Sequence, residues 1–223
     1  MCKIKSAILL KNSVYMPFEH DHHTQMLEEL GIKDDSAFPN FVRIEITPKD
    51  GDLFNHNLDN WQLNIDQDFC PEWLELEDAE TRVKLKLKEW FDKCFIINNQ
   101  NWTEHKTRIW VKNAKVRIEN SSVEARGNSS VVARGNSSVE AWDNSSVVAW
   151  ENSSVEARGN SSVVARGNSS VVARGNSNIL IPKSVLYKHV KINGVYDFAT
   201  VKDLHAEPKI YIANDFDFET IKL

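Results

Sequence analysis

An eight-residue repeat occupies the middle of this chain and restricts its fold more than any other feature. Asparagine recurs at every eighth position from Asn120 to Asn176, and the seven octads between them follow the pattern N-S-S-V-[V/E]-A-[R/W]-[G/D/E]. A helix would be interrupted in every octad, because most octads contain Gly and all contain Asn and two Ser. The alternating side chains are typical of a β-strand, and the Gly-Asn pairs favour a chain reversal. The sequence therefore predicts a β-solenoid over residues 120–176.

The fifth position of the octad indicates that two octads form one coil. Glutamate and valine alternate there, giving two series with a spacing of 16 residues: Glu124, Glu140 and Glu156, and between them Val132, Val148 and Val164. A 16-residue coil would place the two series on opposite faces, whereas a 24-residue coil would mix them. Duplication of a 48-nucleotide unit would leave the same spacing without any structural meaning. We favour the coil, and we expect the Val and Ala of the fourth and sixth positions to point inward.

The seventh position of the octad carries two tryptophans among arginines. In a 16-residue coil each indole would have an arginine on the coil before and the coil after, giving the sets Arg126–Trp142–Arg158 and Arg134–Trp150–Arg166. Guanidinium groups stack on indole rings at the spacing of neighbouring strands. We expect these side chains to stabilise the coil, with capture of a small ligand by Trp142 or Trp150 between protomers as a weaker alternative.

Charge and pattern divide the chain into three predicted parts: an α+β domain at 1–105, the octad solenoid at 106–181 and a β-rich cap at 182–223. Residues 1–105 hold 11 Lys/Arg against 20 Asp/Glu, a net charge of −9, whereas residues 106–223 hold 16 against 12, a net charge of +4. A solenoid exposes sheet edges at both ends, so the flanking parts should cap it. We therefore expect a mainly β fold capped at both ends.

The sequences of the two flanking parts contain patterns that are typical of strands, helices and turns. In the first part we expect strands at 6–10, 13–16, 41–47 and 61–65 and helices at 24–30 and 78–95. In the last part Pro182 should stop further strand pairing, and Asn193-Gly194 should turn a hairpin between His189–Ile192 and Val195–Phe198. Strands are also expected at 210–213 and 216–221.

Two resemblances accompany these patterns. The octads are similar to those of bacterial ice-nucleation proteins, which implies a fold of two octads per coil; the paired threonines of those repeats are missing here, so ice binding is not carried over. Residues 1–105 resemble an uncharacterised bacterial and phage family in several stretches: His22-His23, 41–48, 61–73 (W-Q-L-N-I-D-Q-D-F-C-P-E-W) and 87–91. In that family an α+β domain precedes N-S-S-V repeats. The resemblance implies a phage or mobile-element setting and no activity.

Candidate catalytic and metal-binding groups are sparse. His20-Asp21-His22-His23 has ligand residue types, but four adjacent residues seldom reach one ion, and we expect Asp21 to cap a helix instead. The thiols of Cys2, Cys70 and Cys94 have no recognisable activating partner, and no phosphate-binding or dinucleotide motif is present. We therefore expect no enzyme and no cofactor.

The leading hypothesis is a non-catalytic binding or scaffold protein that presents flat solenoid faces to a protein partner or to itself. The valine series motivates it, because contiguous exposed apolar residues usually mark a contact surface. The alternatives are a nucleic-acid mimic, suggested by the glutamate series, a metal-dependent enzyme in residues 1–105, and an oligomer that sequesters a small ligand. Direct nucleic-acid binding and membrane insertion are not expected. Scattered cysteines and the lack of a signal-like run favour the cytoplasm, that of the host if the chain is phage-encoded.

Overall fold

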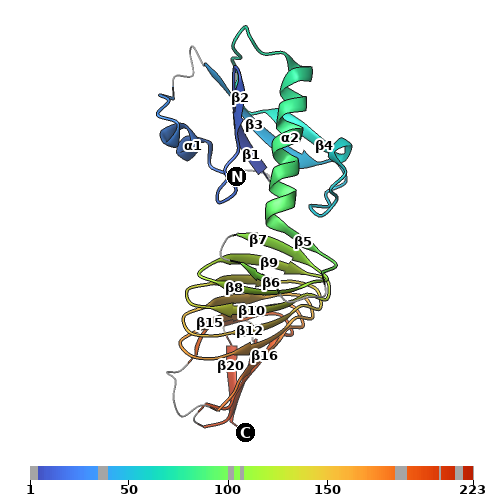
Figure 1. The fold of residues 1–223 in the computed structure, drawn as a ribbon. Coiled ribbons are helices and arrows are strands. Elements are labelled where there is room, and N and C mark those ends of the chain that lie inside the picture. Colours follow the sequence, from blue (N-terminus) through green and yellow to red (C-terminus); the bar gives the residue numbers. More distant parts are fainter. Residues whose placement is uncertain are drawn as a thin grey trace. The chain divides into compact units, whose positions relative to one another are not determined.

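The chain is described by a computed structural model over residues 5–34, 40–99, 103–105, 108–183, 190–205, 207–213 and 218–222. Strands hold 44% of the residues and helices 15%, and the strands form a β-solenoid of about five turns with about 16 residues per turn. The predicted mainly β fold with two octads per coil is therefore confirmed. The chain divides into two compact units, Met1–Phe95 and Ile96–Leu223, which are described separately (Figure 1).

The N-terminal unit is a four-stranded antiparallel sheet with two helices. Its strand order is β2-β1-β3-β4. The element bounds are β1 Lys5–Leu10, β2 Ser13–Tyr15, α1 His23–Glu29, β3 Phe41–Pro48, β4 Trp61–Ile65 and α2 Leu76–Cys94, with a 3-10 turn at Leu58–Asn60. All six elements expected from the sequence are present within a few residues of their predicted ends.

Strand β1 is buried on both faces because each face meets a different helix. On one face Ile8 packs with Met26 and Leu27 of α1. On the alternate face the ammonium group of Lys5 lies 5.5 Å from the ring centroid of Trp90 in α2. Helix α2 turns its apolar stripe inward as its 3.6-residue periodicity predicts, burying Val83, Leu87, Trp90, Phe91 and Cys94.

The C-terminal unit winds the chain alternately through two sheets. The nine-stranded sheet has the order β20-β19-β18-β16-β14-β12-β10-β8-β6, and the seven-stranded sheet the order β17-β15-β13-β11-β9-β7-β5. The octad strands are β9 Ser122–Arg126, β10 Ser130–Arg134, β11 Ser138–Ala141, β12 Ser146–Ala149, β13 Ser154–Ala157, β14 Ser162–Ala165 and β15 Ser170–Ala173. They are flanked by β5 Phe95–Ile97, β6 Thr103–His105, β7 Ile109–Lys112 and β8 Lys115–Glu119 before, and by β16 Asn178–Ile181, β17 Lys191–Val195, β18 Thr200–Asp203, β19 Lys209–Ala213 and β20 Phe218–Lys222 after.

The solenoid core consists of columns of small side chains. The Val of the fourth position and the Ala of the sixth position are at most 3% exposed in every octad, as expected. The second-position serines are also buried, which the sequence analysis missed. The hydroxyl groups of Ser129, Ser137, Ser153 and Ser169 donate to the carbonyl three residues earlier; for example, Ser153 Oγ lies 2.7 Å from Trp150 O. A hydroxyl that is satisfied locally can sit inside an apolar core, so a polar residue type alone does not identify an outward position.

The solenoid extends beyond its predicted limits of 106–181 at both ends. Strands β5 and β6 already belong to its two sheets, and β17 and β18 continue them. β16 ends at Ile181, directly before Pro182, but the sheet continues with the next coil, because β16 pairs in parallel with β18 and the Leu204 amide donates to the Ile181 carbonyl. Pro182 therefore ends its own strand without preventing the residues before it from pairing with a later coil.

The predicted Asn193-Gly194 hairpin is wrong. Both residues lie inside β17, which pairs in parallel with β15. The register shifts between Val171 and Val172, so Asn193 is the extra residue of a β-bulge. The chain turns instead after β17, where Asp197 has a φ of 58° and takes the place that Gly holds in most octads. The backbone groups of β17 form their hydrogen bonds with β15 of the preceding coil, so they do not need the second strand of a hairpin.

Candidate binding faces of the solenoid

The valine series forms a continuous apolar row on the outside of the nine-stranded sheet. The register pairs Val132 with Val148 and Val148 with Val164, one strand apart. The row continues to Leu180, which is 37% exposed and follows Val164 in the next strand. At the spacing of neighbouring strands these four side chains span on the order of 14 Å. The predicted stacking of residues 16 apart is confirmed, and the apolar row is one residue longer than predicted.

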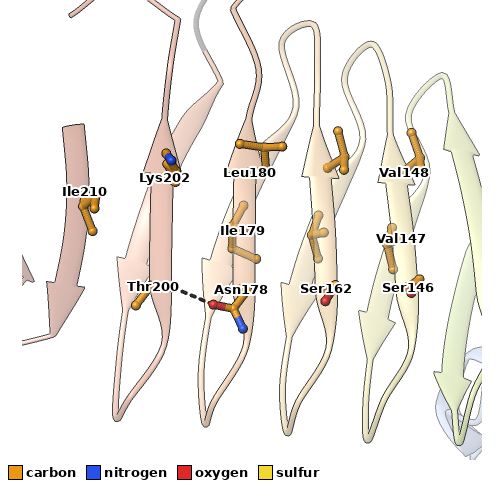
Figure 2. A pocket seen from close by; sticks show the side chains of 12 residues that line it. Ser146, Val147, Val148, Ser162, Asn178, Ile179, Leu180, Thr200, Lys202 and Ile210 are labelled. Carbon is orange, nitrogen blue, oxygen red and sulfur yellow. Dashed lines mark hydrogen bonds between the residues drawn. The ribbon is translucent and has the colours of Figure 1, made fainter. Parts of the chain in front are cut away.

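An open groove of about 510 Å³ lies along the C-terminal part of this row. Figure 2 shows Val148 and Leu180 in one line with Lys202, and Ile210 of β19 beyond them. A second line of polar side chains borders the groove: Ser146, Ser162, Asn178 and Thr200. Thr200 Oγ1 donates to Asn178 Oδ1 over 2.8 Å. The surface is therefore an apolar strip with hydroxyl and amide groups along one side.

The other side of the apolar row is basic and aromatic. It carries Arg134, Trp150 and Arg166, and the guanidinium carbon of Arg166 lies 4.9 Å from the Trp150 ring centroid. At the outward third, fifth and seventh positions of β10, β12, β14, β16 and β18, none of the residues is acidic. The face defined by the Val132–Leu180 row and these two borders is called the apolar face below. Its ligand should offer apolar groups together with negative charge.

The outside of the seven-stranded sheet is different because its fifth position is acidic. Glu124, Glu140 and Glu156 stack in register, and Val172 continues their row. Two of the carboxylates are held by arginines of the same face. Arg126 Nε lies 2.6 Å from Glu124 Oε1, and Glu156 Oε1 accepts from both Arg158 and Arg174 at 2.7 and 2.9 Å. This charge pairing weakens the nucleic-acid mimicry hypothesis, because a mimic needs carboxylates that are not compensated by neighbouring cations.

The tryptophan on the acidic face is enclosed by arginines as expected. The guanidinium carbons of Arg126 and Arg158 lie 5.1 and 4.5 Å from the Trp142 ring centroid, one on each neighbouring coil. Arg174 stacks in the same way on Tyr196, at 4.2 Å. Because arginine groups occupy both sides of the Trp142 indole, the geometry favours a stabilising role over ligand capture.

The histidine cluster of the N-terminal unit is divided among separate partners. Asp21 does not cap α1; its carboxylate lies 2.6 Å from the buried ammonium group of Lys5. His20 Nε2 lies 3.1 Å from Glu29, and His23 is held between the Ile44 carbonyl and Asp66, at 3.1 and 3.3 Å. His22 is the N-cap residue of α1 and makes no side-chain capping bond. The Asp21 carboxylate, which we expected to cap the helix, therefore pairs with buried Lys5 instead.

Within the described residues no group of three or more His, Cys, Asp or Glu side chains is arranged to hold a metal ion. Cys70 is exposed and Cys94 is buried, and Cys2 lies outside the described residues. In the same part of the chain no helix is long and apolar enough to cross a membrane. No protein-family model, no curated protein and no solved structure matches this chain.

Sequence reasoning missed four residues of the two faces. Leu180 continues the apolar row, Lys202 follows Leu180 in register, and Ile210 lines the groove. Tyr196 continues the arginine and tryptophan row. Leu180 follows Val164 at the 16-residue spacing and could have been found by extending the repeat one octad further. The other three follow insertions after Ile181 that shift the spacing, so their register could not be predicted from the repeat.

Proposed function

We propose that this chain is a non-catalytic binding or scaffold protein that uses the apolar face of the solenoid to contact another protein. The observation that carries the proposal is the row of four outward apolar side chains in register, where a solvated strand would alternate polar residues outward. In the phage or mobile-element setting that the sequence resemblance implies, one concrete version is sequestration of a host factor.

The composition of the apolar face supports a protein partner. Protein interfaces have an apolar centre, a polar rim and an enrichment of tryptophan and arginine. The apolar row supplies such a centre, the Ser146 and Ser162 line supplies hydroxyl groups, and Trp150 with Arg166 supplies the side chains typical of strongly contributing contacts. The groove is open and runs across β12, β14, β16 and β18, which suits a protein segment.

The experiment replaces the three repeat valines together: Val132→Lys, Val148→Lys and Val164→Lys. Contact through this face would remove water from each introduced ammonium group, and burying an unpaired charge costs free energy. Association through this face should therefore weaken by at least about tenfold. The readouts are the mass of the protein in solution and the set of proteins recovered from host extract. The control adds the same charge on the opposite sheet at third positions: Ser138→Lys, Ser154→Lys and Ser170→Lys. The proposal is wrong if the valine variant keeps both the mass and the recovered proteins of the parent.

A further inference from the structure

The N-terminal unit carries a segment that combines exposed apolar side chains with negative charge. Residues 65–78 contain six carboxylates and neither Lys nor Arg. Phe69 is 64% exposed and Leu76 is 61% exposed, and Ile65 begins the segment at 37%. Contact between large apolar side chains and water is unfavourable, so burying these side chains against a partner would stabilise the complex. This stretch is called the acidic segment below.

The exposure of Phe69 is a fixed feature of the loop. The Gln67 side chain accepts from the Arg43 amide at 2.8 Å and donates to the carbonyls of Phe41 and Phe69 at 3.1 and 2.6 Å. The Asp66 amide donates to the Arg43 carbonyl at 2.9 Å. These bonds tie the loop to β3, so Phe69 is presented outward from an anchored backbone. A side chain held ready for contact loses less conformational entropy on binding.

Most carboxylates of the acidic segment are not neutralised within the unit. Asp78 pairs with Arg82 at 2.6 Å, and Asp66 lies 3.3 Å from His23. In the described part of the chain no ion pair holds the remaining four: Asp68, Glu72, Glu75 and Glu77. The segment therefore fits a surface that is apolar and basic.

The apolar face of the solenoid is a surface of that kind on the same chain. Its row of Val and Leu side chains is bordered by Arg134 and Arg166 and ends at Lys202. The opposite charges are also evident over longer stretches, with a net charge of −9 for residues 1–105 and +4 for residues 106–223. Complementary charge of this kind speeds encounter and selects the partner more than it adds affinity.

We propose that the acidic segment of one copy of this chain docks on the apolar face of a second copy. Phe69 and Leu76 would cover the Val148–Leu180 row, and the carboxylates would lie beside Arg166 and Lys202. This contact joins two different surfaces, so it is heterologous, and repetition leads to a ring or an open chain of copies. The inference rests on the proposed function, since it names a second copy as the partner of the same face.

The first test measures mass by sedimentation velocity on the full chain, over a range of protein and salt concentrations. Mass should rise with protein concentration and fall with added salt, because the charged contacts are exposed to solvent. Phe69→Ser with Leu76→Ser should weaken association by at least about tenfold. Leu85→Ser is the matched control, because Leu85 is also 61% exposed but lies outside the acidic segment. A parent chain that stays monomeric at its highest soluble concentration would overturn the inference.

The second test mixes two variants that each lack one surface. The Phe69→Ser, Leu76→Ser variant keeps the apolar face, and a Val148→Lys, Val164→Lys variant keeps the acidic segment. Each should be monomeric alone, and the mixture should form a 1:1 heterodimer that grows no further. If two monomeric variants form no heterodimer, the proposed contact between the acidic segment and the apolar face is wrong.

The outcomes also separate this inference from the proposed function. If the segment variant still assembles like the parent while the valine variant does not, the apolar face remains a contact surface with another occupant, and only this inference fails. If the valine variant assembles like the parent, the inference fails, and unchanged recovery of host proteins would remove the proposed function as well.

Discussion

At the scale of single residues, the buried serines show how this solenoid tolerates polar groups in its core. The hydroxyl of Ser153 donates to the Trp150 carbonyl, whereas Ser161 Oγ is buried and has no hydrogen-bond partner in the part of the chain that the structure describes. Both serines are fully buried, so they differ mainly in this bond. The pair isolates the contribution of the hydroxyl from that of its position.

We predict that Ser153→Ala lowers the free energy of unfolding by about 1 kcal/mol, the usual net value of one such bond. Ser161→Ala should change it little or raise it slightly, because no bond is lost and a buried hydroxyl is removed. Urea denaturation of both variants measures the difference. Equal losses would mean that the Ser153 bond contributes nothing measurable.

Three corners of the solenoid carry an acidic residue where most octads have Gly: Asp143, Glu151 and Asp197. Asp143 has a φ of 56°, which is unfavourable for a residue with a Cβ, but its carboxylate accepts from the Gly127 amide at 2.8 Å. The hydrogen bond offsets the backbone strain. We predict that Asp143→Ala, which keeps the strain and loses the bond, destabilises the solenoid by about 1–2 kcal/mol. Asp143→Gly should recover about 1 kcal/mol of that loss. Thermal unfolding ranks the variants, and an alanine variant as stable as the glycine variant would contradict the argument.

His105 makes stability depend on pH. It lies opposite Ile118 in the neighbouring strand, and its Nε2 atom is buried with no hydrogen-bond partner among the described residues. Burial lowers the pKa of His105 below its usual value near 6.5. The folded state therefore prefers the neutral ring: the stabilisation is complete above the unfolded pKa and is lost as the pH falls through about 6.5 toward the folded pKa. We predict that His105→Leu flattens the decline in unfolding free energy between about pH 7 and pH 5. An unchanged slope would show that other groups cause the decline.

At the scale of elements, the coil and not the octad is the structural unit. Each octad places its strand in one sheet and the next octad in the other, so the fifth position alternates between the acidic and the apolar outer face. Removing 16 residues keeps every later strand in its own sheet. Removing eight moves every later strand to the other sheet, including β18, which carries β19 and β20.

We predict that deletion of residues 144–159 leaves a folded protein with cooperative unfolding at a reduced temperature, since one coil of core is lost. Deletion of residues 152–159 should destabilise the chain far more, because the C-terminal strands would then face the wrong sheet. Circular dichroism and thermal unfolding distinguish the two deletions. Comparable stability of both would show that the two halves of the coil are interchangeable.

At the scale of the whole molecule, the sequence predicted most of the architecture because the repeat is periodic and the helices are amphipathic. The 16-residue spacing placed Val148 over Val164 without any structural information. Prediction failed where periodicity ends: Asn193-Gly194 has hairpin chemistry, but parallel pairing with β15 makes it a bulge. Asp21 has capping chemistry, but buried Lys5 takes its carboxylate. Tertiary contacts overrode local preference in both cases.

The account depends on the outward side chains of successive coils lying side by side along one sheet. The direct test places nitroxide spin labels on Cys introduced at Val148 and Val164, with Cys2 and Cys70 replaced by Ser. Labels on adjacent strands, about 4.8 Å apart at the backbone, should show strong spin–spin broadening in the electron paramagnetic resonance spectrum. Labels at Val148 and Glu156, which are closer in sequence but lie on opposite sheets, should show little. Stronger broadening for the second pair than for the first would contradict the coil and the contact surface built on it.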